Sequence, residues 1–382
     1  MILYIAVASF LIWLYLAGVR GGFWRIQRFI LPPASVPDHA PLIAAVVPAR
    51  EEADVIADSL GSLLNQQGVR MHIFLVDDCS TDGTAATAAR AVESAGKSSQ
   101  LTILQGLPLP GGWSGKLWAV QQGIERARSL NPDFLLLTDA DIVHSPESIQ
   151  TLASLSGVGN YDLVSLMVRL HCRTLAERAL IPAFVFFFLM LYPPSWIADP
   201  KRSIAGAAGG CMLIRPHALE RVGGIAAIRN EIIDDCALAR RVKTSGGRVW
   251  LGLTADTRSI RPYGSFAAIG KMISRAAFNQ LRHSGLLLLA TVVGLAVTYL
   301  APPLLVFSAR PAATYLGAAS WLMMALSFLP TVRLYRLNPL WTLLLPAIAL
   351  FYLGATIHSA FKFWIGKGGE WKGRVQDPAR PQ

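Results

Sequence analysis

Three short apolar runs in the first half of the chain each end in charged side chains, and this repeated pattern constrains the fold more than any other feature. Each run has the length of a buried strand and is followed by a turn and a helical pattern. Strands that alternate with helices from Pro41 to Leu253 predict an α/β domain with a mostly parallel sheet. The runs and their charged ends are Leu42–Val47 with Arg50, Glu51 and Glu52, His72–Val76 with Asp77 and Asp78, and Phe134–Leu137 with Asp139 and Asp141.

The acidic strand ends point to a ligand site at one edge of this sheet. Open α/β sheets bind ligands beyond the carboxyl ends of their strands. Asp139 and Asp141 follow such a strand as an Asp-Ala-Asp triplet, and one or two carboxylates suit Mg²⁺ or Mn²⁺ held together with substrate phosphates. An isolated triplet is also an ordinary surface turn. The two neighbouring charged strand ends favour the metal site.

Another carboxylate pair, Asp234 and Asp235, opens the helical pattern from Cys236 to Val242. Acidic residues are common there because the helix dipole favours anions at its N-terminus. The pair therefore has a structural interpretation as a helix cap as well as a chemical one.

Four motifs occur in the order and spacing of one known family. Through them the chain resembles the family 2 glycosyltransferases and, through Gly111–Val120, Asp162–Leu170 and Glu177–Phe188, the hopene-associated bacterial members. The resemblance implies a GT-A fold for the catalytic domain, which we place at residues 38–284. The four motifs are Val47–Glu52, Val76–Thr84, Thr138–Asp141 and Ile233–Asp235.

The resemblance implies transfer of a sugar from a nucleotide-diphosphate donor, with inversion and with metal dependence. Asp77 or Asp78 is then expected to contact the base or ribose, and Glu52 and Lys116 to line the same cleft. Asp139 and Asp141 hold Mg²⁺ or Mn²⁺, which stabilises the charge of the leaving diphosphate. Lys116 also has the simpler interpretation of a solvated lysine after a Gly-Gly turn.

On the acceptor side, the resemblance makes Asp235 the general base for the attacking hydroxyl and Asp234 the residue that orients the site. Gly209 and Gly210 precede an expected strand and allow the acceptor to approach the backbone closely. A tight turn is the alternative explanation of these glycines.

Two positions depart from the family pattern. Glu51 stands where many relatives carry Asn, and Asn279–His283 only approximates the Gln-Gln-x-Arg-Trp motif of processive polysaccharide synthases. The missing Trp argues against a polymerase. Arg282 is expected to approach the donor diphosphate or, alternatively, to be a juxtamembrane arginine.

Apolar segments and charge predict a membrane protein. Residues 2–19 form an N-terminal anchor, and three further segments within residues 285–361, namely 285–308, 312–332 and 340–360, each have about the length of a bilayer span. Residues 38–284 carry 24 Lys and Arg against 22 Asp and Glu, so most of the net charge of +11 lies in the membrane flanks. A nucleic-acid-binding domain would carry that excess on its own surface. The charge suits anionic lipid headgroups instead.

The positive-inside rule gives the topology. Arg20, Arg25 and Arg28 follow the first segment, which places the catalytic domain in the cytoplasm at a bacterial inner membrane. Residues 362–382 form a basic tail that we expect on the same side, with one C-terminal segment re-entrant or interfacial.

The four cysteines all lie in the domain that is placed in the cytoplasm, and we expect them to be reduced thiols. Ile181–Tyr192 is expected to lie in the membrane interface or, alternatively, to be a buried helix of the domain.

Together with these membrane features, the family resemblance implies a multi-pass inverting glycosyltransferase that acts on a lipid hydroxyl, with a hopanoid as the acceptor that the resemblance suggests. Two alternatives remain: a polyprenyl-phosphate glycosyltransferase, and a catalytically silent membrane scaffold that binds nucleotide sugar. The sequence does not specify the sugar or the oligomeric state.

Overall fold

The protein divides into two compact units. The computed structural model describes residues 1–32, 39–366, 370–371 and 374–375. Unit 1 contains residues 1–28, 172–195 and 262–369, and unit 2 contains residues 29–171, 196–261 and 370–382. The block 38–284 expected from the sequence is therefore interrupted, because residues 172–195 and 262–284 cluster with unit 1. Most of the expected basic tail lies outside the described residues.

Unit 2 is built on an eight-stranded sheet in the order β3-β2-β1-β4-β7-β6-β8-β5. Parallel pairs join β1 to β2 and β4, β2 to β3, and β6 to β8, whereas β7 is antiparallel to both of its neighbours. The α/β class with a mostly parallel sheet is thereby confirmed. The strands are β1 (Leu42–Ala49), β2 (Arg70–Asp77), β3 (Leu101–Gln105), β4 (Phe134–Thr138), β5 (Ile142–Val143), β6 (Leu163–Arg169), β7 (Cys211–Ile214) and β8 (Val249–Ser259).

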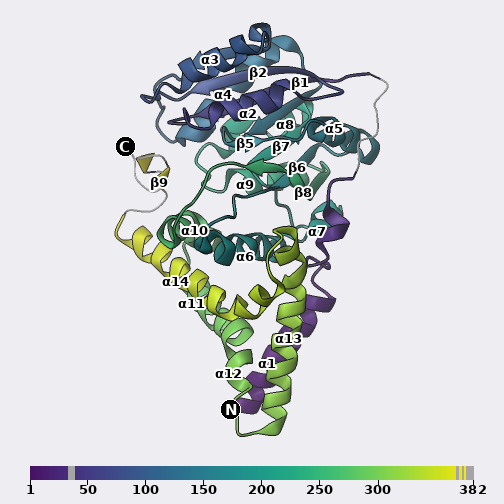
Figure 1. The fold of residues 1–382 in the computed structure, drawn as a ribbon, viewed down its shortest axis with the longest axis vertical. Coiled ribbons are helices and arrows are strands. Elements are labelled where there is room, and N and C mark those ends of the chain that lie inside the picture. Colours follow the sequence, from purple (N-terminus) through teal and green to yellow (C-terminus); the bar gives the residue numbers. More distant parts are fainter. Residues whose placement is uncertain (33–38, 367–369, 372–373, 376–382) are drawn as a thin grey trace. The chain divides into compact units, whose positions relative to one another are not determined.

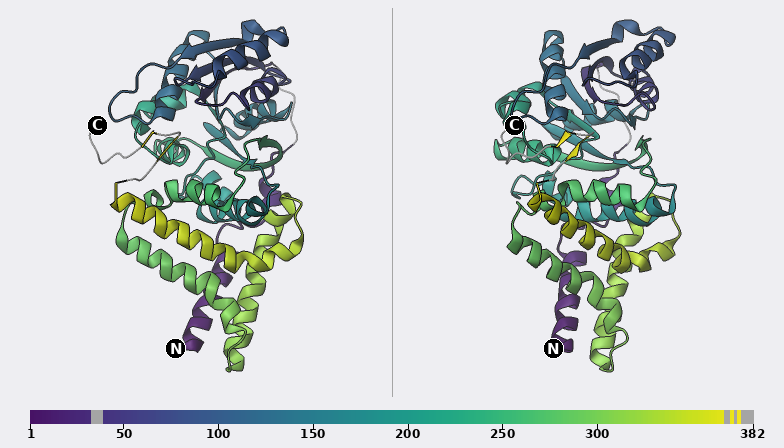
Figure 2. Two further views of the ribbon diagram at one scale, coloured as in Figure 1. Left: turned by 60° about the vertical axis from the view of Figure 1, so that its left-hand side comes forward. Right: turned by 90° about the vertical axis from the view of Figure 1, so that its left-hand side faces the viewer.

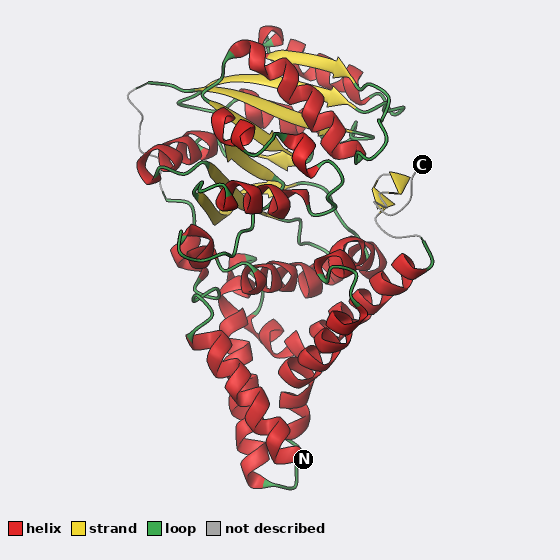
Figure 3. Cartoon of the chain, turned by 180° about the vertical axis from the view of Figure 1, so that it is seen from behind, coloured by secondary structure: helices red, strands yellow, loops and turns green. Residues whose placement is uncertain are grey.

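Helices cover both faces of this sheet (Figure 3), because successive side chains of a strand point to opposite faces. Ile43 and Val47 of β1 join the core cluster with residues of α2, α3 and α5. On the other face, a Cβ on Gly123 of α4 would lie 2.5 Å from Val46, so glycine allows that helix to approach β1. The helices of unit 2 include α2 (Ile56–Leu64), α3 (Thr84–Ser94), α4 (Gly115–Ala127), α5 (Ser148–Gly159), α8 (Pro216–Arg221) and α9 (Asp234–Thr244).

The strand order reverses at β1, whose neighbours are β2 on one side and β4 on the other. Open α/β sheets bind ligands at such a switch point, beyond the carboxyl ends of the strands. The charged strand ends of β1, β2 and β4 therefore meet where a ligand site is expected.

Unit 1 is helical, and α1 packs along α13 in all views (Figure 1, Figure 2). The indole Nε1 of Trp13 donates to the Thr298 carbonyl over 2.7 Å, and its ring meets Tyr299 edge-on. The helices are α1 (Ile2–Gly18), α6 (Leu175–Leu191), α10 (Phe266–Gln280), α11 (Gly285–Leu295), α12 (Ala301–Leu305), α13 (Pro311–Leu334) and α14 (Leu345–Trp364).

In the part of the chain that the structure describes, four segments are long and apolar enough to cross a bilayer: Leu175–Ala198, Gly285–Leu305, Pro311–Leu334 and Pro339–Trp364. The last three coincide with the C-terminal spans expected from the sequence. The N-terminal helix, with 17 residues, is shorter than these four.

The segment containing α6 is a special case. The strands before and after it in the chain, β6 and β7, are hydrogen-bonded neighbours in one sheet. A single crossing by α6 would require the following non-helical chain to return through lipid, where its backbone groups would lack partners. This argues against a single crossing and supports the expectation of an interfacial or buried helix.

Candidate active site

The loops after β1 and β2 are locked together by hydrogen bonds. The backbone N–H of Thr81 donates to Oε1 of Glu51 over 2.8 Å, and the N–H of Glu51 donates to Oγ of Ser80 over 3.0 Å. Glu51 has φ 53° and Cys79 has φ 55°, both in the left-handed region. Strained backbone of this kind is concentrated at functional sites. Asn tolerates this region better than Glu does, which gives a physical reason for Asn in relatives at position 51.

Asp77 and Asp78 are both buried at the end of β2. Oδ1 of Asp77 accepts from the Ser80 N–H over 3.1 Å, and the Arg50 guanidinium lies 3.7 Å from Asp78 Oδ2. The two carboxylates thus hold the loop and its arginine. Their contact with a base or ribose stays a prediction. Asp82 precedes Gly83, the N-cap residue of α3, and its carboxylate accepts from the backbone N–H groups of Ala53 and Thr84.

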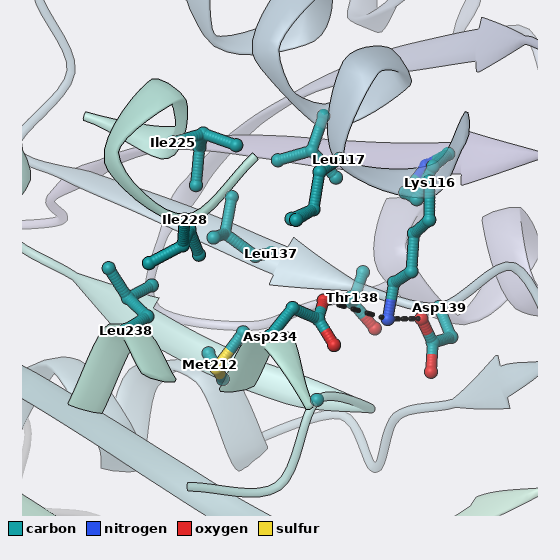
Figure 4. A pocket seen from close by; sticks show the side chains of 13 residues that line it. Lys116, Leu117, Leu137, Thr138, Asp139, Met212, Ile225, Ile228, Asp234 and Leu238 are labelled. Carbon is teal, nitrogen blue, oxygen red and sulfur yellow. Dashed lines mark ion pairs between the residues drawn. The ribbon is translucent and has the colours of Figure 1, made fainter. Parts of the chain in front are cut away.

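Lys116 lies at the centre of the polar cluster (Figure 4). Its Nζ is 2.9 Å from Asp139 Oδ1 and 3.5 Å from Asp234 Oδ2. Burial alone would lower the pKa of Lys116, but the carboxylates of Asp139, Asp234 and Asp235 outweigh it and raise this pKa. The lysine side chain is only 22% exposed. It is therefore a partly buried counter-ion of these carboxylates and not the solvated lysine of the simpler interpretation.

Asp235, in the first turn of α9, is held through both of its oxygens. Oδ2 accepts from the Gly209 N–H over 2.8 Å, and Oδ1 accepts from the Cys236 N–H over 2.7 Å. Burial and the nearby charge of Asp234 raise the pKa of Asp235 to about 6, against the opposing effects of Lys116 and the two amides. A carboxylate with a pKa near the working pH is suited to accept a proton.

Asp141 faces a different partner set from Asp139. Its Oδ2 accepts from Ser259 Oγ over 2.7 Å and lies 3.8 Å from Nε of Arg261, whose guanidinium also contacts the Glu52 carboxylate. Burial and the charge of Asp139 raise the pKa of Asp141. Sequence reasoning missed Arg261. The signal was available, because Arg261 follows the carboxyl end of β8 as the other charged residues follow their strands.

A buried hydrogen-bond chain links the Asp139 loop to the glycine loop. Thr138 Oγ1 donates to the Gly210 carbonyl over 2.8 Å and lies 3.0 Å from Nε2 of His144. Because the threonine proton is used toward Gly210, Nε2 of His144 is the donor to Thr138. Burial lowers the pKa of His144 to about 3, so it is neutral. Sequence reasoning missed this residue as well.

The pocket next to Lys116 joins these polar groups to an apolar wall. Lys116, Asp139, Asp234 and Gly209 contribute one part of its lining (Figure 4). Pro48 and Thr138 complete it at the sheet. The apolar wall consists of Leu117, Val120, Leu137, Met212, Ile225, Ile228 and Leu238.

The residues fit a divalent cation that arrives with phosphate ligands. Among the described residues, no group of three or more His, Cys, Asp or Glu side chains is arranged to hold a metal by itself. Asp139 and Asp141 are two repelling carboxylates, and the Asp139 side chain is 37% exposed. Mg²⁺ is commonly bound by one or two carboxylates together with substrate phosphates and water, which is the donor set that these loops offer.

Ten of the predicted residues lie in unit 2, around the carboxyl ends of its strands and the start of α9. The exception is Arg282, an exposed residue that follows α10 in unit 1 with φ 51°. Its contact with the donor stays a prediction. The ten residues of unit 2 are Glu52, Asp77, Asp78, Lys116, Asp139, Asp141, Gly209, Gly210, Asp234 and Asp235.

Comparison with known proteins agrees with the α/β fold of unit 2. The chain is 33% identical over 159 residues to the succinoglycan biosynthesis protein ExoO of Rhizobium meliloti (strain 1021), a match covering 40% of this chain and 42% of that protein. It also resembles the mannosyltransferase PcManGT of Pyrobaculum calidifontis, solved in complex with GDP-Man and Mn²⁺, with 18% identity and a TM-score of 0.60. That likeness covers 95% of this chain and 99% of the other and confirms the expected GT-A type of fold. Residues 44–223 match the family model described as glycosyl transferase family 2, so this part of the chain is a family 2 glycosyltransferase domain.

Proposed function

We propose that the protein is a membrane-bound, inverting glycosyltransferase that moves a sugar from a nucleoside-diphosphate sugar to a lipid hydroxyl. One observation carries the proposal: in a family 2 domain, Lys116 bridges Asp139 of the proposed donor side and Asp234 of the proposed acceptor side. Donor and acceptor groups that share one pocket are suited to a direct transfer between two bound reactants.

The donor half of the reaction depends on charge. Departure of a diphosphate builds negative charge, and preorganised cations stabilise it. Lys116 supplies one positive charge within reach of Asp139. A divalent cation held by Asp139 and Asp141 would supply Lewis-acid stabilisation of the same charge. The Mn²⁺ in the mannosyltransferase from Pyrobaculum calidifontis supports this choice of metal class.

The acceptor half depends on a base. Asp235 takes the proton of the acceptor hydroxyl while the hydroxyl oxygen forms a bond to the anomeric carbon. The bond from that carbon to the diphosphate breaks at the same time. Displacement from the face opposite the leaving group inverts the anomeric configuration. The Gly209 amide fixes the orientation of Asp235, and Asp234 shares Lys116 with the donor side.

A lipid acceptor is supported by the helices of unit 1. Among the described residues, three C-terminal segments are long and apolar enough to cross a bilayer, and we place α6 in the membrane interface. We place the protein in the bacterial inner membrane with unit 2 in the cytoplasm, and a hopanoid is the acceptor that we propose first. A polyprenyl phosphate is the second candidate acceptor.

The test compares lipids from a gene-deletion strain and its parent by mass spectrometry. Loss of one glycosylated lipid identifies both sugar and acceptor, and a glycosylated hopanoid supports the first candidate. Purified protein should then transfer sugar to that lipid with Mg²⁺ or Mn²⁺, and excess chelator should abolish transfer reversibly. If the deletion changes no lipid in the cell and the purified protein transfers no sugar, the nucleotide-sugar-binding scaffold is the remaining explanation.

A further inference from the structure

Arg261 occupies a defined position between two carboxylates of the proposed donor site. Its guanidinium contacts the Glu52 carboxylate, and its Nε lies 3.8 Å from Asp141 Oδ2. Glu52 follows β1, Asp141 follows β4 and Arg261 follows β8, so three loops of unit 2 meet at this guanidinium. The Arg261 side chain is 30% exposed, whereas those of Glu52 and Asp141 are 11% and 17% exposed.

Arg261 and a divalent cation need the same carboxylate. Oδ2 of Asp141 already accepts from Ser259 and faces Arg261. A second positive charge at Asp141 would be repelled by the guanidinium, because like charges a few ångströms apart oppose each other strongly in a partly buried site. A metal can bind fully at Asp141 only when Arg261 has another anion to pair with.

A diphosphate is an anion of the required kind. The guanidinium is planar, permanently charged and matched to phosphate oxygens, which it binds through two parallel hydrogen bonds. Arg261 lies at the same edge of the sheet as Asp139 and Asp141, and its partial exposure leaves it accessible to a ligand.

We propose that Arg261 is an exchangeable counter-ion of the donor site, which neutralises Glu52 and Asp141 in the free protein and pairs with the nucleotide diphosphate when the donor binds. The exchange releases Asp141 for the divalent cation. This inference rests on the proposed function in one respect, since it takes a nucleoside diphosphate as the ligand. The exchange makes metal binding and nucleotide binding cooperative, so that each ligand raises the affinity for the other by the same factor.

The experiment measures Mn²⁺ binding to the purified full chain by the loss of the free-ion electron paramagnetic resonance signal. Wild type should bind Mn²⁺ weakly alone and more tightly with UDP or GDP. Arg261→Gln should bind Mn²⁺ alone about 5- to 10-fold more tightly than wild type, and the nucleotide should add less, on the scale of ordinary coupling between sites. A merely structural role for Arg261 predicts the opposite sign, because loosened loops would weaken the metal site.

Arg258→Gln is the matched control, because Arg258 is an exposed arginine on β8, the strand that Arg261 follows. It removes the same charge and should leave Mn²⁺ affinity unchanged. Arg261→Lys keeps the charge and should bind Mn²⁺ alone as wild type does. If Arg261→Gln misfolds because Glu52 loses the contact with the guanidinium, Glu52→Gln/Arg261→Gln removes both charges and should still bind Mn²⁺ alone more tightly than wild type.

Three outcomes overturn the inference: Mn²⁺ affinity that is unchanged or lower in both glutamine variants, an equal gain in Arg258→Gln, or no effect of either nucleotide on Mn²⁺ binding by wild type. Failure of the proposed function is seen separately. If the protein shows the predicted Mn²⁺ pattern but transfers no sugar to any lipid, the Arg261 exchange is supported and the proposed activity is wrong.

Discussion

The backbone N–H of Gly209 donates to Oδ2 of Asp235 over 2.8 Å, so the glycine loop before β7 fixes the carboxylate that opens α9. A Cβ at Gly209 would lie 3.3 Å from that same oxygen and 3.5 Å from Nζ of Lys116. The absence of a side chain at this position therefore preserves both the hydrogen bond and the space beside the lysine.

Gly209→Ala should lower turnover by roughly 10-fold or more, because small displacements of reacting groups are costly in catalysis. Gly157→Ala is the control, since a Cβ there meets nothing within 4 Å. Turnover and donor affinity measured on both proteins decide the matter. An alanine at 209 with normal turnover would show that the glycine merely serves a tight turn.

Substitutions at Asp141 and at Asp235 should impair different steps of the reaction. Asp141→Asn should weaken metal-dependent binding of the nucleotide sugar. Asp235→Asn should leave donor binding near normal and lower turnover by roughly 10²- to 10⁴-fold, the reach of a positioned general base. Donor titrations and turnover on the purified variants test this. Wild-type turnover in Asp235→Asn would favour a lipid-phosphate acceptor, whose nucleophile is already ionised.

The pH dependence of turnover should reflect the same carboxylate. Because burial and Asp234 raise the pKa of Asp235 to about 6, the base is protonated and inactive below that pH and ionised above it. Turnover at saturating donor should rise through about pH 6 and level off near pH 7. The small residual activity of Asp235→Asn should lack this rise, and the same rise in that variant would assign it to another group.

The contribution of Asp235 to stability should fall as pH rises, whereas turnover should increase. A pKa raised above the unfolded value means that Asp235 contributes most to stability below its unfolded pKa, and this contribution is lost as pH rises through about 6. Lys116 opposes the loss, since it lies beside the clustered carboxylates. Lys116→Met should therefore destabilise unit 2 by roughly 3 kcal/mol at pH 8. The cost should shrink at pH 5, where Asp235 is protonated and no longer needs the lysine charge, and thermal unfolding at both pH values measures it.

Glu51→Asn should be tolerated. Asn adopts the left-handed region more readily than Glu, and its side-chain oxygen retains an acceptor like the one that Thr81 uses. We expect a thermal midpoint within a few degrees of wild type and near-normal donor binding. Glu51→Val is the contrast, because a β-branched residue strains this backbone and lacks the acceptor. Equal midpoints for the two variants would contradict the conformational explanation of position 51.

The C-terminal tail should lie on the cytoplasmic side. An outside N-terminus followed by one anchor and three full spans would put Lys362 and the basic residues after it outside, against the positive-inside rule. One C-terminal segment is therefore expected to be re-entrant or interfacial. A reporter fused after Gln382 should be active only in the cytoplasm, and activity confined to the periplasm would refute this topology.

The sequence by itself determined the α/β class, the position of the strands and the charged residues that follow them. Local patterns suffice for these features, because a buried strand and the turn after it are encoded within a few residues. The three C-terminal apolar segments were likewise visible from composition and length.

Only the tertiary structure decided which charges meet. Lys116 and Asp234 are far apart in the chain, yet α4 and α9 bring them to 3.5 Å. Arg261 reaches Asp141 because β5, which begins directly after Asp141, pairs with β8, which ends just before Arg261. The pairing order of strands depends on packing across the whole sheet and not on local pattern. For that reason the ion pairs of Lys116, the neutral His144 and the Arg261 counter-ion were found in the fold and not in the sequence.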